Sequence, residues 1–229
     1  MKKALTILSV FFLSFAQAQE TKQIPQISAT GEGKVKVTPD QASISVTVET
    51  KGNNAKDVKN QNDTKIDAVL KFIKKMNVAP ADFKTERVAL NPQYDYEKKK
   101  HNYNATQTIV ILLRDLGKYD ELMEGLVNEG INRIDAVTFQ SSKLAQYQSE
   151  ARKLAMKDAK LKAEDYVSVL GQKVGKAFTI VDNSQTYYPQ PTYAMMRKSE
   201  DMDVNEPRET LALGEITITA NVMVSFILD

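Results

Sequence analysis

Cysteine and tryptophan are absent from this chain of 229 residues, and histidine occurs once. The lack of cysteine excludes disulfide bonds, thiol nucleophiles and cysteine-ligated metals. The single histidine, His101, follows a run of lysines, and no Gly-x-Ser-x-Gly motif or zinc-ligand spacing accompanies it. We therefore interpret His101 as a solvated side chain, and we expect no catalytic residues, no metal site and no cofactor.

A hydrophobic run long enough to cross a membrane is also missing. The N-terminus carries Lys2 and Lys3, an apolar run over residues 4–16, and then Ala16-Gln17-Ala18. A bilayer span needs about 20 apolar residues, whereas a basic start, a short apolar run and small residues at −3 and −1 are typical of a secretory signal. We expect residues 1–18 to be a cleaved signal peptide, with no integral membrane span and a periplasmic or otherwise exported chain of residues 19–229.

The expected mature chain has no excess of positive or of negative charge. Loss of the two N-terminal lysines leaves 29 basic and 29 acidic residues. Such a chain has no overall field that would draw it to nucleic acid. The Lys98-Lys99-Lys100 run has tyrosines nearby, as nucleic-acid patches do, but the neutral charge and the export favour an exposed hairpin tip. We expect no nucleic-acid partner.

Alternating polar and apolar residues predict several strands. The alternation is clearest at residues 41–50 and at residues 216–228, and we expect the second of these strands to be paired deep in a sheet. The turn at Thr38-Pro39-Asp40 predicts that residues 27–37 form a hairpin with residues 41–50. Further strands are predicted at residues 83–96, 104–114, 131–140 and 178–181.

Helical periodicity predicts three helices, over residues 58–76, from Leu116 to Gly130, and over residues 141–171. The longest has an apolar stripe whose middle is alanine, which indicates close packing against a sheet. The order of elements is typical of one α+β domain, with a largely antiparallel sheet and helices packed on one face. The stripe consists of Leu144, Tyr147, Ala151, Ala155, Ala159, Ala163, Tyr166 and Leu170.

Residues 183–211 have no sustained period and are unusually long for a loop inside a domain. Two interpretations stay open: the loop folds back on the body, or it is a contact surface, since Tyr and Met are enriched at interfaces. Its acidic residues lack the glycine and the spacing of a calcium loop. The possible contact residues are Tyr187, Tyr188, Tyr193, Met195, Met196 and Met202, and the acidic residues are Asp201, Asp203, Glu206 and Glu209.

Gly31-Glu32-Gly33 has the glycines of a phosphate loop. A phosphate loop precedes a helix N-terminus, whereas this segment continues into the strand residues Val35 and Val37. We therefore predict a structural role for the two glycines.

Several segments, read together and in order, resemble the SIMPL-domain family of bacterial envelope proteins. The likeness implies an α+β fold, a periplasmic or surface location and, in some relatives, a ring-like or channel-like homo-oligomer, with an oxidative-stress label and no established catalytic residues. Residues 102–106 depart from the family pattern because they lack an arginine that is common there. The segments that carry the likeness are residues 27–33, 37–40, 90–96, 110–116, 130–134, 151–155, 158–159 and 162–164.

Three functional hypotheses follow. The first is a non-enzymatic envelope protein that self-associates through edge strands and the loop at residues 183–211. The second is a periplasmic binding module for a small ligand, with a groove beneath that loop. The third is a hydrolase that uses paired carboxylates, as glycoside hydrolysis requires.

Overall fold

The computed structural model describes residues 24–97, 99–184 and 213–229. The α+β class is confirmed. The predicted signal peptide lies outside the described residues, as do Lys98, the contact residues Tyr187, Tyr188, Tyr193, Met195, Met196 and Met202, and the four acidic residues of the loop. The elements are β1 (Gln26–Val37), β2 (Gln41–Gly52), α2 (Ala55–Lys75), η1 (Pro80–Asp82), β3 (Phe83–Asp95), β4 (Lys100–Leu113), η2 (Leu116–Lys118), α3 (Tyr119–Asn128), β5 (Arg133–Gln140), α4 (Leu144–Ser168), β6 (Val174–Asp182) and β7 (Ile216–Leu228).

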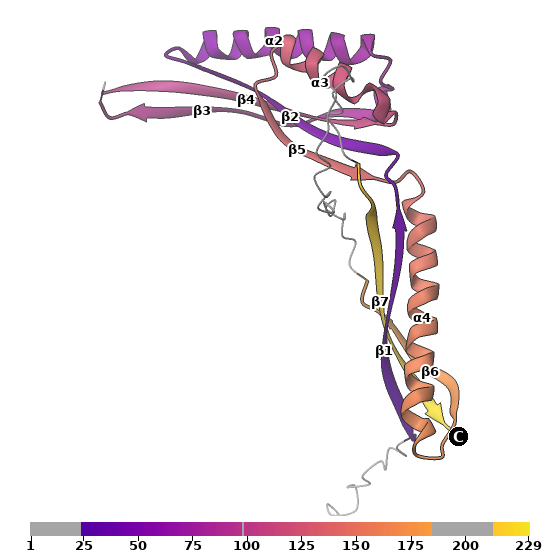
Figure 1. The fold of residues 1–229 in the computed structure, drawn as a ribbon. Helices are drawn as coiled ribbons and strands as arrows, with labels where there is room; N and C mark the ends of the chain where they lie inside the picture. Colours follow the sequence, from indigo (N-terminus) through magenta and orange to yellow (C-terminus); the bar gives the residue numbers. More distant parts are fainter. Residues whose placement is uncertain (1–23, 98, 185–212) are drawn as a thin grey trace, which may run out of the picture.

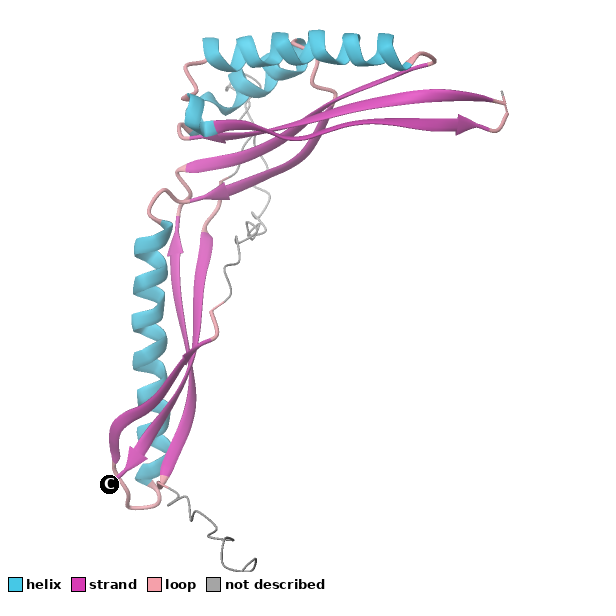
Figure 2. Ribbon diagram, turned by 180° about the vertical axis from the view of Figure 1, so that it is seen from behind, coloured by secondary structure: helices cyan, strands magenta, loops and turns pink. Residues whose placement is uncertain are grey.

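The strands are divided between two antiparallel sheets, and the molecule is L-shaped (Figure 1). The head lobe consists of the sheet β3-β4-β2-β5 with α2 and α3, and the stem lobe consists of the sheet β1-β7-β6 with α4. Figure 2 shows α4 running along one face of the stem sheet. Helices thus cover one face of each sheet, as predicted, but the sequence pattern did not predict the division into two sheets.

The hairpin predicted between residues 27–37 and 41–50 is wrong. β1 pairs with β7 along its whole length, from Gln26 opposite Ile227 to Val37 opposite Ile216. β2 instead lies between β4 and β5 in the head lobe. The turn therefore leads the chain from one sheet to the other, and at this corner Asp40 accepts hydrogen bonds from the backbone N–H and the hydroxyl of Ser142. These bonds tie the two segments that connect the lobes.

The head core lies between the sheet and its helices. The predicted alternation in β2 is confirmed, since Ala42, Ile44, Val46 and Val48 are fully buried on the helix side. The β3–β4 hairpin and the burial of the central strand β4 are confirmed as well. The residues that complete this core include Ile66, Val69, Ile73, Ile109, Ile111, Leu113, Leu122 and Leu126.

The stem core is built from small residues. Ala151, Ala155, Ala159 and Ala163 of α4 are fully buried, which confirms the close packing predicted for the alanine stripe. They pack on the stem sheet, in which β7 is the central strand, as predicted. The end of the predicted stripe is wrong, because Tyr166 and Leu170 are exposed and Val167 is buried instead.

The two glycines of the Gly31-Glu32-Gly33 segment lie under α4. A Cβ added at Gly31 would lie 1.9 Å from the carbonyl oxygen of Ala155, and one at Gly33 would lie 2.0 Å from that of Ala151. The segment is part of β1 and precedes no helix, so its predicted structural role is confirmed.

Candidate functional site

The face of the head sheet opposite the helices carries the candidate site, at the part of this face where polar side chains gather. Because side chains alternate along strands, the residues between the buried positions of β2 and β4 point to this face. One row crosses the sheet: Arg87 of β3 lies opposite Thr108, Thr108 opposite Thr47, and Thr47 opposite Arg133 of β5. Two arginines thus flank a pair of hydroxyl groups.

Both edge strands of the head sheet carry a β-bulge next to this row. Glu86 is the extra residue of β3, between Thr85 and Arg87, and Asp135 is the extra residue of β5, next to Ile134. Bulges redirect side chains and are common beside binding sites. Each edge strand thereby brings one acid and one arginine to the same hollow of about 450 Å³, which is lined by Ser45, Glu86, Arg87, Thr106, Thr108, Arg133 and Asp135.

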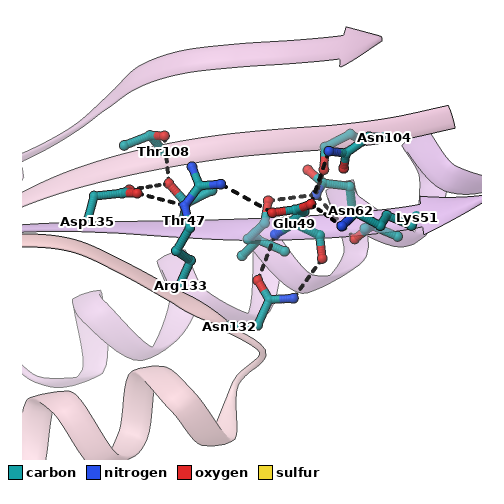
Figure 3. Close-up of polar contacts among 12 residues, drawn as sticks. Thr47, Glu49, Lys51, Asn62, Asn104, Thr108, Asn132, Arg133 and Asp135 are labelled. Atoms are coloured by element: carbon teal, nitrogen blue, oxygen red, sulfur yellow. Dashed lines mark hydrogen bonds and ion pairs between the residues drawn. The ribbon is translucent and has the colours of Figure 1, made fainter. Parts of the chain in front are cut away.

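A directed hydrogen-bond chain crosses the floor of this hollow (Figure 3). The buried hydroxyl of Thr47 donates to Asp135 Oδ2 at 2.5 Å, and it lies 2.7 Å from the hydroxyl of Thr108. A hydroxyl group has one proton, so Thr108 is the donor to Thr47. The oxygen of Thr108 therefore remains available only as an acceptor.

Ion pairs continue the network along β2. Arg133 donates from Nε to Asp135 Oδ1 at 2.7 Å and from Nη1 to Glu49 Oε2 at 3.2 Å. Glu49 also accepts from Lys51 at 2.8 Å and from Asn104 at 3.0 Å. The positive charge of Arg133 is thus matched by two carboxylates (Figure 3).

These contacts hold both carboxyl groups ionised. The hydrogen bond from Lys51, with those from Asn104 and the nearby charges, lowers the pKa of Glu49 despite its partial burial. Burial raises the pKa of Asp135, but the hydrogen bonds from Thr47 and Arg133 outweigh it and the pKa lies below its ordinary value. A carboxylate with a lowered pKa is a weak base, and here Asp135 orients the hydroxyl group of Thr47 and the guanidinium group of Arg133.

Other residues singled out in the sequence lie outside this site. His101 is exposed on the β3–β4 hairpin, 5.1 Å from the ring of Tyr94, which confirms the predicted hairpin tip. Arg114, in a segment that carries the family resemblance, donates to Asp82 at 2.6 and 2.7 Å and has a structural role. No group of three His, Asp or Glu side chains that could hold a metal ion occurs within residues 24–97, 99–184 and 213–229.

The segment that departs from the family pattern, residues 102–106, borders the open face. Asn104 donates to Glu49 there, while its own Oδ1 is buried without a hydrogen-bond partner. Sequence reasoning gave no site role to Thr47, Arg87, Arg133 or Asp135, although Arg133 lies in a segment that carries the family resemblance. The alternation at residues 41–50 could have indicated the polar face, but the two bulges hide which residues of β3 and β5 share it.

A second hollow, of about 480 Å³, lies in the stem lobe beside Ser184, the last described residue before residue 213. Some of its polar groups bond to one another: Ser184 bonds to both backbone groups of Asn221, and Asp182 accepts from the backbone of Ser184. Gln148 and Arg152 of α4 line it as well.

The free edge of the stem sheet is a further candidate, as an interaction surface. Among the described strands β6 pairs with β7 alone, and its Phe178, Ile180 and Val181 are 53%, 56% and 43% exposed. The opposite edge strand, β1, carries the exposed charged residues Glu32, Lys34 and Lys36. Charged side chains protect edge strands from pairing with other chains. β6 carries the exposed charged residues Lys176 and Asp182, and the stretch between them, residues 177–181, is uncharged.

Comparison with known proteins matches the chain to one family and to two of its bacterial relatives. The profile of the SIMPL family, described as a protein of unknown function (DUF541), matches residues 27–226. The uncharacterized protein YggE of Escherichia coli K12 is 28% identical over 185 residues, covering 80% of this chain and 75% of the relative. The 26 kDa periplasmic immunogenic protein of Brucella melitensis is 24% identical over 222 residues, covering 93% and 89%. No helix in the described part of the chain is long and apolar enough to cross a membrane.

Proposed function

The chain belongs to the SIMPL family, and on this premise we propose that it is an exported, non-enzymatic protein of the bacterial envelope that acts by self-association. A relative that covers most of its length is named as periplasmic, which supports the location. The lowered pKa of Glu49 and of Asp135 makes both carboxylates weak bases, which supports a role without catalysis. The oxidative-stress role that the resemblance implies has no support from a described residue and is not part of the proposal.

One observation carries the proposal of self-association: the apolar and unpaired edge of β6. Over Thr179–Asp182 this strand pairs regularly with β7, so its other edge presents backbone N–H and C=O groups in strand geometry. A strand from another chain gains both these hydrogen bonds and the contacts of Ile180 and Val181. Two stems that meet β6 to β6 would join two three-stranded sheets into one sheet of six strands, in an isologous dimer interface.

The test is sedimentation velocity on residues 19–229 across a dilution series. We expect the wild-type chain to form a species larger than the monomer, and the Ile180→Lys/Val181→Lys double variant to remain monomeric. Val88→Lys is the matched control, because Val88 is a 69% exposed residue of the head edge strand β3. A monomeric wild-type chain at all concentrations would overturn the proposal, and an assembled double variant would overturn the role of β6.

The second candidate function is that of a small-ligand-binding module. The polar hollow of the head lobe favours it, because Arg87 and Glu86 line this hollow without a hydrogen bond or ion pair in the described part of the chain. Self-association through the stem and ligand binding on the head use different lobes, so one protein can have both functions.

A further inference from the structure

We propose that the polar hollow on the open face of the head sheet binds a zwitterionic ligand, an α-amino acid or a short peptide. The carboxylate of the ligand pairs with Arg87, and its ammonium group pairs with Glu86 or Asp135. This inference is independent of the proposed self-association, because the hollow lies in the head lobe and β6 lies in the stem lobe.

The charge balance of the hollow decides the class of ligand. Arg133 is already matched by Asp135 and Glu49, so the cation of the hollow that has no counter-ion among the described residues is Arg87. The unmatched anion is Glu86, the bulge residue directly before Arg87. A ligand with one charge would leave one of these two groups uncompensated, whereas a zwitterion matches both. The hollow therefore favours a ligand that is neutral overall but carries both charges.

The hydrogen-bonding groups on the floor favour the same ligand. Thr108 presents only an acceptor, and Asp135 has further acceptor capacity on its carboxylate beyond the bonds from Thr47 and Arg133. An ammonium group has three donors and no acceptor, so it is the complement of these oxygens. The hydroxyls of Ser45 and Thr106, which also line the hollow, supply both donors and acceptors.

The size of the site limits the ligand to a small molecule. The volume of about 450 Å³ lies within the ordinary range for small-molecule pockets. The two edge strands lie three strand spacings apart, about 14 Å between backbones, and the side chains of Arg87 and Asp135 shorten this span. A single amino acid would pair with Glu86 and Arg87 on one edge, whereas a dipeptide bound to Arg87 by its carboxylate would place its ammonium group nearer to Asp135.

The test is a saturation-transfer difference NMR titration of residues 19–229, which works for monomers and assemblies alike. The probes are alanine and alanyl-alanine, with N-acetylalanine as the analogue that lacks the ammonium group and alaninamide as the analogue that lacks the carboxylate. We expect saturable binding of the zwitterions and at least about tenfold weaker binding of both analogues, the ratio typical of one lost charge-assisted contact. Tighter binding of alanyl-alanine than of alanine would assign the site to peptides, and equal binding would assign it to amino acids.

Substitutions of the residues that line the hollow test whether the zwitterion binds there. Arg87→Gln and Glu86→Gln should each weaken zwitterion binding about tenfold. Both side chains are exposed, so we expect neither change to unfold the head lobe. Lys84→Gln is the matched control, since this exposed lysine lies on the same strand outside the hollow, and it should leave binding unchanged. No saturable zwitterion binding, equal binding of N-acetylalanine, or unchanged binding by Arg87→Gln would each overturn the proposal. The sedimentation profile is a separate readout, so failure here is distinguishable from failure of self-association.

Discussion

Gly31 and Gly33 set how closely α4 lies on β1. Helix and strand backbones are so near that a methyl group at either position would meet a carbonyl oxygen of α4 at about half of a normal contact distance. The alanines opposite them are fully buried. The stability of the stem therefore depends on the absence of side-chain atoms at these two positions.

Gly31→Ala should destabilise the chain by about 3 kcal/mol, at the upper end of ordinary overpacking costs, because α4 must move away from the sheet. Urea unfolding followed by circular dichroism measures this change. Thr30→Ala, at the exposed neighbouring position of the same strand, is the control and should change stability by less than about 0.5 kcal/mol. A Gly31→Ala variant as stable as this control would contradict the packing described here.

The Asp82–Arg114 pair links stability to pH. The hydrogen bonds from Arg114, together with its positive charge, lower the pKa of Asp82 against the effect of burial. A carboxyl group with a lowered pKa in the folded state stabilises the fold above its unfolded pKa, and this contribution is lost as the pH falls toward the folded pKa.

Asp82→Asn should therefore destabilise the protein at neutral pH, and its difference from the wild type should shrink below about pH 4. Urea midpoints at a series of pH values from 7 to 3 measure this difference. Asp67→Asn is the control, because Asp67 forms an exposed helix-surface pair with Lys71, and such pairs contribute little. A difference between wild type and Asp82→Asn that is the same at every pH would rule out this linkage.

At the scale of elements, the contact between α4 and its sheet turns around the helix. The buried residues Ala151, Ala155, Ala159, Ala163 and Val167 are spaced by four residues, whereas a helical turn has 3.6. The line of contact therefore rotates by about 40° with each step. This rotation follows the twist that every β-sheet has, and it explains why Val167, and not Tyr166, ends the buried stripe.

Ala155→Leu should cost about 2 to 3 kcal/mol through overpacking, while Leu161→Ala, at a 59% exposed position of the same helix, should have an effect within about 0.5 kcal/mol. Thermal unfolding of the two variants measures both effects. If Leu161→Ala were the more damaging change, the assignment of the buried face of α4 would be wrong.

Sequence patterns predicted most elements and their type, because one buried face leaves a clear period of 2 or 3.6 residues. They failed where the deciding contact is distant in the chain. The turn at Thr38-Pro39-Asp40 looks like a hairpin turn, but β1 pairs with the distant strand β7, and Ser142 donates hydrogen bonds to Asp40 at this corner. The polar face was missed for a similar reason, since the bulges at Glu86 and Asp135 shift the alternation of both edge strands.

At the scale of the whole molecule, each lobe has its own hydrophobic core. The buried cluster of the head and that of the stem share no residue. The sequence did not predict this division, because strands of both sheets alternate with the same period and no change in composition marks the boundary. The partner of each strand, and not its pattern, decides to which sheet it belongs.

Because each lobe has its own core, we expect a destabilising substitution in the stem lobe to loosen the stem lobe and leave the head lobe unchanged. In hydrogen exchange followed by mass spectrometry, Gly33→Ala should speed the exchange of amides in β1 and β7 and leave β2 and β4 nearly unchanged. Thr30→Ala again is the control. A uniform increase across both lobes would mean that the lobes unfold as one unit.

The central claim, self-association through the free edge of β6, is tested most directly by hydrogen exchange of residues 19–229 at high and at low protein concentration. We predict slower exchange of the β6 amides, above all within Thr179–Asp182, at high concentration, with no matching change in the head sheet. Exchange of β6 that is independent of concentration, or protection that appears on β3 instead, would contradict the claim.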